Sequence, residues 1–336
     1  MAPNPSSDIA SFRASLASAK SVIILSGAGL SAASGIPTYR NADNSLWNNW
    51  DPKLYAVPEA FKTDPVRVWK FYHRRRAEYL LARPNAAHRA LALLAHAPTR
   101  ARIVPSHTPL HITQNVDALA LRALESLADG EGEGEDGAKA DESLIEMHGD
   151  IFVTRCTQCG HVARSYAPVL SAALAALQDQ DQDPQTPDQD QDQDPDGEAG
   201  AGAGAAITID QLPKCGGEGA KSNRYGRCGG LLRPDVVWSG EMPPQMGEIS
   251  RRMSGCDLLL LVGTSATVHP AAGFSSQVKK NGGKVAVFNL AGARTTVGEE
   301  EADWAFLGPC EETLVDVLGV EEDIARLWPD AGAYTN

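Results

Sequence analysis

Residues Ser21-Val-Ile-Ile-Leu-Ser26 are followed directly by Gly27-Ala28-Gly29-Leu30-Ser31-Ala32 in this chain of 336 residues. The apolar, β-branched run predicts a short strand that is buried on both faces, as in a parallel sheet. The Gly-x-Gly-x-x-Ala pattern after it allows a tight turn and a close approach of the backbone to a pyrophosphate. This stretch therefore indicates a parallel α/β fold with a dinucleotide-binding turn.

Further strands and helices alternate along the chain. Apolar runs at Leu110–Thr113, Leu258–Val262 and Val285–Phe288 predict three more strands, and Ala86–Ala95 has a helical pattern. Because such alternation forms βαβ units, we expect a Rossmann-like parallel sheet with helices on both faces. Pro37 would stop a long crossover helix soon after the glycine turn, which disfavours an ordinary dehydrogenase.

The negative charge of the chain is concentrated in two stretches. There are 30 basic and 43 acidic residues, a net charge of −13. Residues 129–142 carry −6 and residues 178–198 carry −9, so the rest of the chain carries +2. We interpret 129–142 and 178–206 as disordered acidic inserts, because they contain too little apolar surface to offset the entropy of ordering. The charge argues against a nucleic-acid binder, and no apolar run reaches the roughly 20 residues that span a bilayer.

Four of the six cysteines have a spacing typical of a metal site. Cys156-x2-Cys159 resembles a zinc knuckle, and the distant Cys215 and Cys228 complete the four thiolates that structural zinc prefers. The alternative is four unpaired thiols, whereas a redox-active first pair is disfavoured because no thioredoxin-like helix follows. Cys256 is interpreted as a core thiol. Six cysteines are too few for a disulfide scaffold, which favours a reducing compartment.

Four polar motifs remain. Thr113-Gln-Asn-Val-Asp117 and Gly263-Thr-Ser265 follow predicted strands, where open parallel sheets bind ligands, and Glu146-Met-His-Gly-Asp150 and Val236-Val-Trp-Ser-Gly-Glu241 flank the cysteine module. Taken alone, His148 is more often structural than catalytic. Together with the glycine turn, Ser34-Gly-Ile-Pro-Thr-Tyr-Arg40 and the cysteines, however, these motifs resemble the sirtuins, a family of NAD-dependent protein-lysine deacylases.

The resemblance implies a role for each matching residue. NAD would be bound by Gly27, Ala28, Gly29, Ser31, Tyr39, Arg40, Gln114, Asn115, Asp117, Gly263, Thr264, Ser265, Asn289 and Cys310. His148 would be the general base and Asn115 a second catalytic residue, while Val236, Trp238, Gly240 and Glu241 would pair with an extended substrate peptide. NAD would be consumed, giving nicotinamide and O-acyl-ADP-ribose, and one structural zinc would be held by the four cysteines.

Three departures from the family pattern accompany this resemblance. The family often has His where this chain has Ala120, and usually has Phe where this chain has Ser239. The second cysteine pair is also unusually far apart. These differences concern local packing, peptide affinity and the rigidity of the zinc loop, and they leave the catalytic residues in place.

The predicted helix Val68–Arg76 bears on the choice of acyl group. Tyr72 and Arg75 share one helix face, where an arginine fork binds a carboxylate and a tyrosine adds a hydroxyl donor. On their own, the arginines Arg74–Arg76 are interpreted as a solvated basic face. Tyr72, Arg75 and Ala56 are, however, similar to the acyl-selecting residues of class III sirtuins, which remove succinyl, malonyl and glutaryl groups.

We therefore expect a deacylase with a discontinuous domain organisation. Residues 1–41, 98–150 and 233–330 would form the Rossmann-like NAD-binding domain, residues 42–97 a helical segment at the cofactor loop and acyl pocket, and residues 151–232 a zinc-binding module. The enzyme would be a monomer that acts on acyl-lysine proteins, without nucleic-acid or membrane partners.

Alternative functions and locations stay open. A plain NAD-dependent lysine deacetylase and a mono-ADP-ribosyltransferase fit the same scaffold, and a non-catalytic NAD sensor is disfavoured by Asn115, Asp117 and His148. The resemblance favours mitochondria, with cytoplasm or nucleus as the alternative. The first 20 residues have no apolar signal core, and Asp8 is unlike a mitochondrial presequence.

Overall fold

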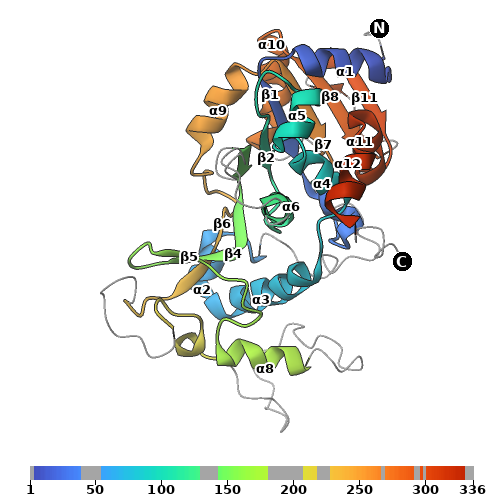
Figure 1. Ribbon diagram of the computed structural model, residues 1–336. Coiled ribbons are helices and arrows are strands. Elements are labelled where there is room, and N and C mark those ends of the chain that lie inside the picture. Colours follow the sequence, from blue (N-terminus) through green and yellow to red (C-terminus); the bar gives the residue numbers. More distant parts are fainter. Residues whose placement is uncertain are drawn as a thin grey trace. The chain divides into compact units, whose positions relative to one another are not determined.

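The computed structural model describes residues 4–38, 54–128, 143–180, 207–217, 228–265, 269–290, 296–297 and 300–329. These belong to two compact units (Figure 1). Unit 1 comprises Met1–Trp50, Ala82–Asp150 and Met242–Asn336, and unit 2 comprises Asp51–Leu81 and Ile151–Glu241. The predicted acidic inserts lie outside the described residues, except that a helix continues through the first three residues of the second insert.

Unit 1 is built on a six-stranded parallel sheet, in the order β11-β8-β7-β1-β2-β3. The strands are β1 Val22–Ser26, β2 Leu110–Thr113, β3 Leu144–Glu146, β7 Leu258–Val262, β8 Lys284–Asn289 and β11 Trp304–Leu307. This is the Rossmann strand order, and it reverses between β1 and β7. The carboxyl ends of these two strands therefore mark the place where such sheets bind their ligands.

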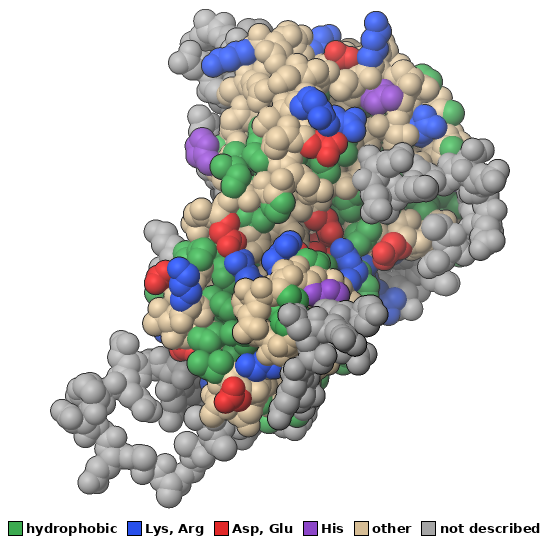
Figure 2. Space-filling model, turned by 90° about the vertical axis from the view of Figure 1, so that its left-hand side faces the viewer, with side chains coloured by type: hydrophobic (Ala, Val, Ile, Leu, Met, Phe, Trp, Pro, Cys, Tyr) green, Lys and Arg blue, Asp and Glu red, His purple; other side chains and the backbone are tan. Residues whose placement is uncertain are grey.

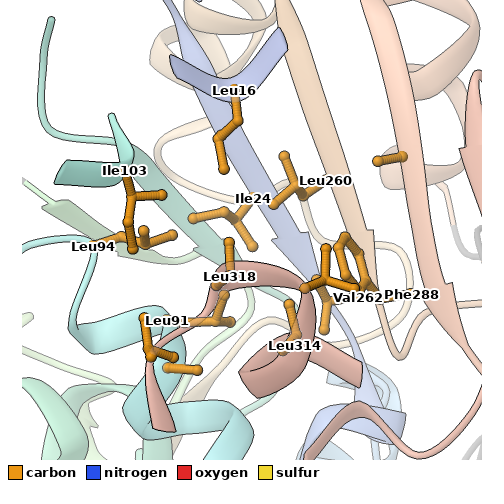
Figure 3. Packing of buried hydrophobic residues seen from close by; sticks show 14 of the residues in the cluster. Leu16, Ile24, Leu91, Leu94, Ile103, Leu260, Val262, Phe288, Leu314 and Leu318 are labelled. Carbon is orange, nitrogen blue, oxygen red and sulfur yellow. The ribbon is translucent and has the colours of Figure 1, made fainter. Parts of the chain in front are cut away.

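Helices cover both faces of this sheet, as predicted, because its central strands are apolar on both sides. Ile24 and Leu260 point into a cluster with Leu91, Leu314 and Leu318 (Figure 3), whereas the alternate residues of the same strands pack into a second cluster. The first face carries α1 Ile9–Ser18, α4 Ala86–Ala92, α5 Ala97–Ile103, α11 Cys310–Leu318 and α12 Glu321–Leu327, and the second carries α9 Met246–Ser254 and α10 Phe274–Lys280 (Figure 1).

The remaining elements of unit 1 are short, apart from one helix. They are the 3-10 helices η1 Ala28–Ser34 and η5 Ala271–Gly273, the helix α6 Leu119–Ala128, and the antiparallel pair β9 Thr296–Val297 and β10 Glu300–Glu301. Residues 82–97, which we expected in the smaller part, lie in unit 1. The reason is that Ala87, Ala90 and Leu91 of α4 are buried in the core of the sheet.

Unit 2 combines helices with a three-stranded sheet of order β5-β4-β6. Its elements are α2 Pro58–Thr63, α3 Pro65–Leu81, β4 Gly149–Cys156, β5 Val162–Arg164, α8 Ala172–Gln180, η4 Ile209–Gln211 and β6 Leu232–Val236. The helix α3 is fixed by Arg76, which donates to the carbonyls of Ile151, Ser165 and Ala167 at 2.7–3.1 Å. Arg75 and Arg76 are both buried, so the prediction of a solvated basic face was wrong for them.

Charged side chains of both signs lie on the face of the molecule drawn in Figure 2. There, basic and acidic side chains are interspersed, which agrees with the near-neutral body of the chain. Within the described residues, every helix is too short or too polar to cross a bilayer.

Candidate functional site

The glycine turn after β1 packs directly against the turn after β7. The backbone N–H of Gly29 donates to the carbonyl of Gly263 at 2.8 Å, and that of Gly27 donates to Val262 at 3.0 Å. A Cβ atom on Gly29 would lie 2.8 Å from the Cα of Gly263, closer than atoms can pack. The glycines are therefore required for the contact between the two turns at the switch point.

The amides of Gln114 and Asn115, just after β2, are held beside this turn. Gln114 Nε2 donates to the Ser26 carbonyl at 3.1 Å and to Thr264 Oγ1 at 3.0 Å. Asn115 Nδ2 donates to the Gly27 carbonyl at 3.1 Å and to Ser31 Oγ at 3.0 Å. The protein itself thus fixes both side chains at the carboxyl ends of the central strands.

Ser31 connects Asn115 with a buried carboxylate. Its hydroxyl donates to Asp117 Oδ2 at 2.6 Å, and Asp117 Oδ1 accepts from the Leu119 backbone N–H at 2.9 Å. Burial raises the pKa of Asp117, although these hydrogen bonds oppose the shift. His88 Nε2 lies 3.4 Å from the same hydroxyl, and burial lowers the pKa of His88 to about 3, so its ring is neutral.

His148 is positioned by the backbone of the same polar segment. Its Nδ1 lies 2.9 Å from the carbonyl oxygen of Gln114. A carbonyl only accepts, so Nδ1 carries the hydrogen and Nε2 carries the lone pair in the neutral ring. Burial lowers the pKa of His148, and the Gln114 carbonyl partly offsets this. The side chain can therefore accept a proton at Nε2 near neutral pH.

Four of the residues expected to bind NAD lie near the ends of β7 and β8. They are Thr264, Ser265, Asn289 and Cys310. Asn289 Nδ2 donates to the Thr264 carbonyl at 2.9 Å, and the Cys310 thiol donates to the Phe288 carbonyl at 3.7 Å. Ser265 is half-buried beside Thr264. Burial raises the pKa of Cys310 to about 11, so this side chain is a neutral thiol.

In unit 2, Arg233 contacts two residues of the segment 236–241, which is expected to bind a substrate peptide. Its guanidinium makes two hydrogen bonds to the Glu241 carboxylate, at 2.7 and 2.9 Å, and lies 3.5 Å from the centre of the Trp238 ring. The strand ends at Val236, and residues after it form a turn in which Gly240 has a φ of 91°. Of the residues expected to contact a substrate peptide, Val236 is therefore the last residue of β6, and Trp238, Gly240 and Glu241 lie in the segment after it.

The three expected acyl-selecting residues lie together in unit 2. The Ser239 backbone N–H donates to the Ala56 carbonyl at 2.8 Å, and the indole N–H of Trp238 donates to the Tyr72 hydroxyl at 2.8 Å. Arg75 lies one helical turn after Tyr72, with its guanidinium 5.6 Å from the centre of the Phe71 ring. Its Nη1 is 2.8 Å from Glu78 Oε2.

The four cysteines Cys156, Cys159, Cys215 and Cys228 form one cluster, with all Sγ atoms within 4.8 Å of one another. The Sγ atoms of Cys156 and Cys228 are 3.3 Å apart, and those of Cys159 and Cys215 are 3.8 Å apart. In a tetrahedral zinc site with Zn–S bonds of about 2.3 Å, sulfurs are separated by about 3.8 Å. The donor set and its spacing therefore fit zinc, and none of the four cysteines forms a disulfide.

The chemistry of these thiols also fits a cation. Backbone N–H groups of Cys159 and Gln158 outweigh the effect of burial and bring the pKa of Cys156 to about 7. Burial raises the pKa of Cys215 to about 12, and a bound cation would favour the thiolate form of both side chains. Gly230 leaves room for the sulfur of Cys156, since a Cβ at position 230 would lie only 2.9 Å from that sulfur.

Two expected residues, Tyr39 and Arg40, lie outside the described residues. Three residues that the sequence interpretation did not select are part of the arrangement: Asn85, His88 and Arg233. Asn85 begins α4 and donates to the Leu30 carbonyl at 2.8 Å. The Asn-x-x-His spacing of a capping box was the available signal for the first two.

Unit 1 has a parallel sheet in the Rossmann strand order with polar residues after its strands, and unit 2 carries the four-cysteine cluster. These features define a Rossmann-type α/β protein with a second unit suited to a structural metal. The chain belongs to the Sir2 family, whose model matches residues 27–270.

Relatives and solved structures agree with this assignment. The chain is 38% identical to "NAD-dependent protein deacylase sirtuin-5, mitochondrial" of Canis lupus familiaris, over 95% of this chain and 87% of that protein. It is 34% identical to "NAD-dependent protein deacylase" of Daphnia pulex, over 94% and 97% of the two chains. The crystal structure of a Sir2 homologue in complex with NAD has a TM-score of 0.66 and 30% identity, covering 96% of this chain and 97% of that one.

Proposed function

We propose that the chain is an NAD-dependent protein-lysine deacylase of the class III type, which removes succinyl, malonyl and glutaryl groups. The observation that carries the proposal is the arrangement in unit 1. The turn Gly27-Ala28-Gly29, in which both glycines pack closely against the turn after β7, lies at the switch point of the sheet. Asn115 follows β2, the strand next to β1, and the oriented His148 follows β3 and lies against the Gln114 carbonyl. The printed names of the relatives support the same activity.

Hydrogen bonds within the protein preorganise the polar side chains of the proposed NAD site. Bound NAD supplies a sugar carbon from which nicotinamide can leave. Asn115, Ser31 and Asp117 are already joined by hydrogen bonds of 2.6–3.0 Å, so they need little reorganisation when charge develops on that sugar. The turn at Gly27–Gly29 has Cβ-free backbone at Gly27 and Gly29, which would let it approach the pyrophosphate closely.

His148 supplies the base. Its Nδ1–H is held by the Gln114 carbonyl, and its Nε2 lone pair accepts a proton from a ribose hydroxyl, which then attacks the bound acyl group. A base of this kind contributes about 10²- to 10⁴-fold to the rate.

The acidic acyl group would be bound in unit 2. Arg75 is a buried cation one helical turn from the Tyr72 hydroxyl, and a buried guanidinium is suited to a carboxylate. Ala56 contributes only a methyl group, which leaves space for a longer acyl chain. The cysteine cluster would hold one zinc ion with a structural role.

Location and assembly are part of the proposal. The sirtuin-5 relatives of dog, frog and zebrafish are named as mitochondrial, and we place this protein in mitochondria as a monomer acting on acylated proteins. A tagged chain that co-fractionates with another compartment would contradict the location. Light scattering of the purified protein measures its mass in solution.

The test is mass spectrometry of succinyl-, malonyl-, glutaryl- and acetyl-lysine peptides incubated with the full chain and NAD. We expect NAD-dependent loss of the acidic acyl groups and no loss with His148→Tyr, whose folding is checked by circular dichroism. Loss of acetyl groups alone would indicate a plain deacetylase. A peptide that gains ADP-ribose would indicate a transferase, and NAD binding without turnover a sensor.

A further inference from the structure

Arg75 already has a carboxylate partner within its own helix. Glu78, three residues later on α3, places Oε2 2.8 Å from Arg75 Nη1. The Arg75 side chain is 5% exposed, whereas the Glu78 side chain is 31% exposed. A counter-ion stabilises a buried guanidinium, and Glu78 supplies one whose partly exposed side chain retains access to water.

The same guanidinium is the group that the proposed function assigns to the acyl carboxylate. The Arg75 side chain lies over the Phe71 ring, whose edge meets Tyr72 with ring centres 5.0 Å apart. Trp238 fixes Tyr72 in turn through its indole N–H. Arg75, Tyr72 and Trp238 are thus tied to one another, while Glu78 is the partly exposed member of the group.

We propose that Glu78 is a specificity-determining residue, an internal competitor of the substrate's acyl carboxylate for Arg75. This inference rests on the proposed function. The guanidinium fork has donors for two carboxylates, but two negative charges on one cation repel each other. An acidic acyl group must therefore share Arg75 with Glu78 or displace it into water. An uncharged acyl group meets neither cost, so Glu78 reduces the preference for acidic over neutral acyl groups.

The experiment compares the wild type with Glu78→Gln, which keeps the shape of the side chain and removes its charge. We measure kcat/KM for a succinyl-lysine and an acetyl-lysine peptide of the same sequence at saturating NAD. We expect the ratio of succinyl to acetyl to rise about fivefold through a lower KM for the succinyl peptide, the factor expected for a partly exposed ion pair. Substitution of a residue with only a structural role would change kcat/KM for both peptides by the same factor and leave their ratio constant.

The matched control is Glu59→Gln. Glu59 pairs with Lys62 at 3.3 Å on the exposed side of α2 in the same unit, and its removal should leave the ratio at the wild-type value. Should Glu78→Gln fail to fold, Glu78→Ala removes the same charge and is measured instead.

The outcomes separate this inference from the proposed function. A wild type that removes succinyl groups, combined with a ratio that stays constant or falls in the Glu78 variants, overturns the competition and makes Glu78 an orienting residue for Arg75. A wild type with no NAD-dependent removal of succinyl groups overturns the acidic acyl assignment itself, and the role of Glu78 with it.

Discussion

Arg75 and Arg76 are neighbours on α3 and are both buried, and the contacts described for them differ. Arg76 donates to three backbone carbonyls and lies over the Phe152 ring, with its guanidinium carbon 5.1 Å from the ring centre. Arg75 has the Glu78 carboxylate instead. Arg76 donates to carbonyls of the fold, so we assign it a structural role, whereas we expect Arg75 to exchange its ionic partner for another carboxylate.

This difference leads to a prediction for Arg75→Met. The change keeps most of the apolar stem and removes the cation, so removal of succinyl groups should fall at least about 100-fold, the loss expected when a buried charge partner is deleted. Weak deacetylation should largely survive. Kinetics with matched succinyl and acetyl peptides measure both, with Arg67→Met on the same helix as the control. Unimpaired desuccinylation would refute the carboxylate-binding role.

A second prediction concerns the pH dependence set by His148. The active form of the base is the neutral ring, and burial lowers the pKa of His148 from its ordinary value of about 6.5. Activity should therefore persist as the pH falls and decline only below that value, where the ring becomes protonated. The pH profile of kcat/KM for an acyl peptide measures the midpoint of this decline. A midpoint above neutrality would contradict the assignment of His148 as the base.

At the scale of elements, the turn from β1 into η1 depends on the absence of side chains. Gly29→Ala would force its new methyl group against Gly263 and separate the two turns. We expect a loss of about 1–3 kcal/mol in the free energy of unfolding, together with a higher KM for NAD. Denaturant unfolding and NAD titration measure these effects.

Gly247 offers the matched control. It lies in α9, with open space where a Cβ would be. Gly247→Ala should leave the KM for NAD unchanged and raise the free energy of unfolding by up to about 1 kcal/mol. Equal effects of the two substitutions would show that the turn has no special requirement for glycine.

Sequence reasoning succeeded best for the central strands. β1, β7 and β8 are mainly apolar runs that composition identifies, and β2, Leu-His-Ile-Thr, is a less apolar run whose residues are all buried. The edge strands β3 and β11 were not predicted, because they are short and include polar or exposed positions. The place of α4 was also missed: its alanines show that it packs closely, but not against which part of the chain.

The site could be predicted only in part, for a similar reason. The motif residues Gln114, Asn115 and His148 were selected because their types suit the chemistry. Their hydrogen bonds to Ser26, Gly27 and Gln114 join distant segments, and these depend on the strand order. Glu78 and Arg233 carry ordinary surface charges in the sequence, and only the folded chain shows that their partners are functional candidates.

At the scale of the whole molecule, the cysteine cluster should stabilise unit 2 through a bound ion. We expect about one zinc per chain by metal analysis, and a lower melting temperature after chelation, because metal binding contributes directly to folding. Cys156→Ser should lose the metal. Cys256→Ala, a change at a buried thiol of the sheet core, should retain it. A metal-free protein with an unchanged melting temperature would argue for four unpaired thiols.

The pairing of β1 with β7 has a consequence for biosynthesis. β1 ends at Ser26, but β7, which pairs with one of its two edges, spans Leu258–Val262, so the ribosome must add more than 230 further residues before that edge is paired. Until then, the nascent chain presents an apolar edge with unsatisfied backbone groups, which is prone to association. Early truncation should therefore yield insoluble fragments, and the enzyme should depend on chaperones until translation has passed β7.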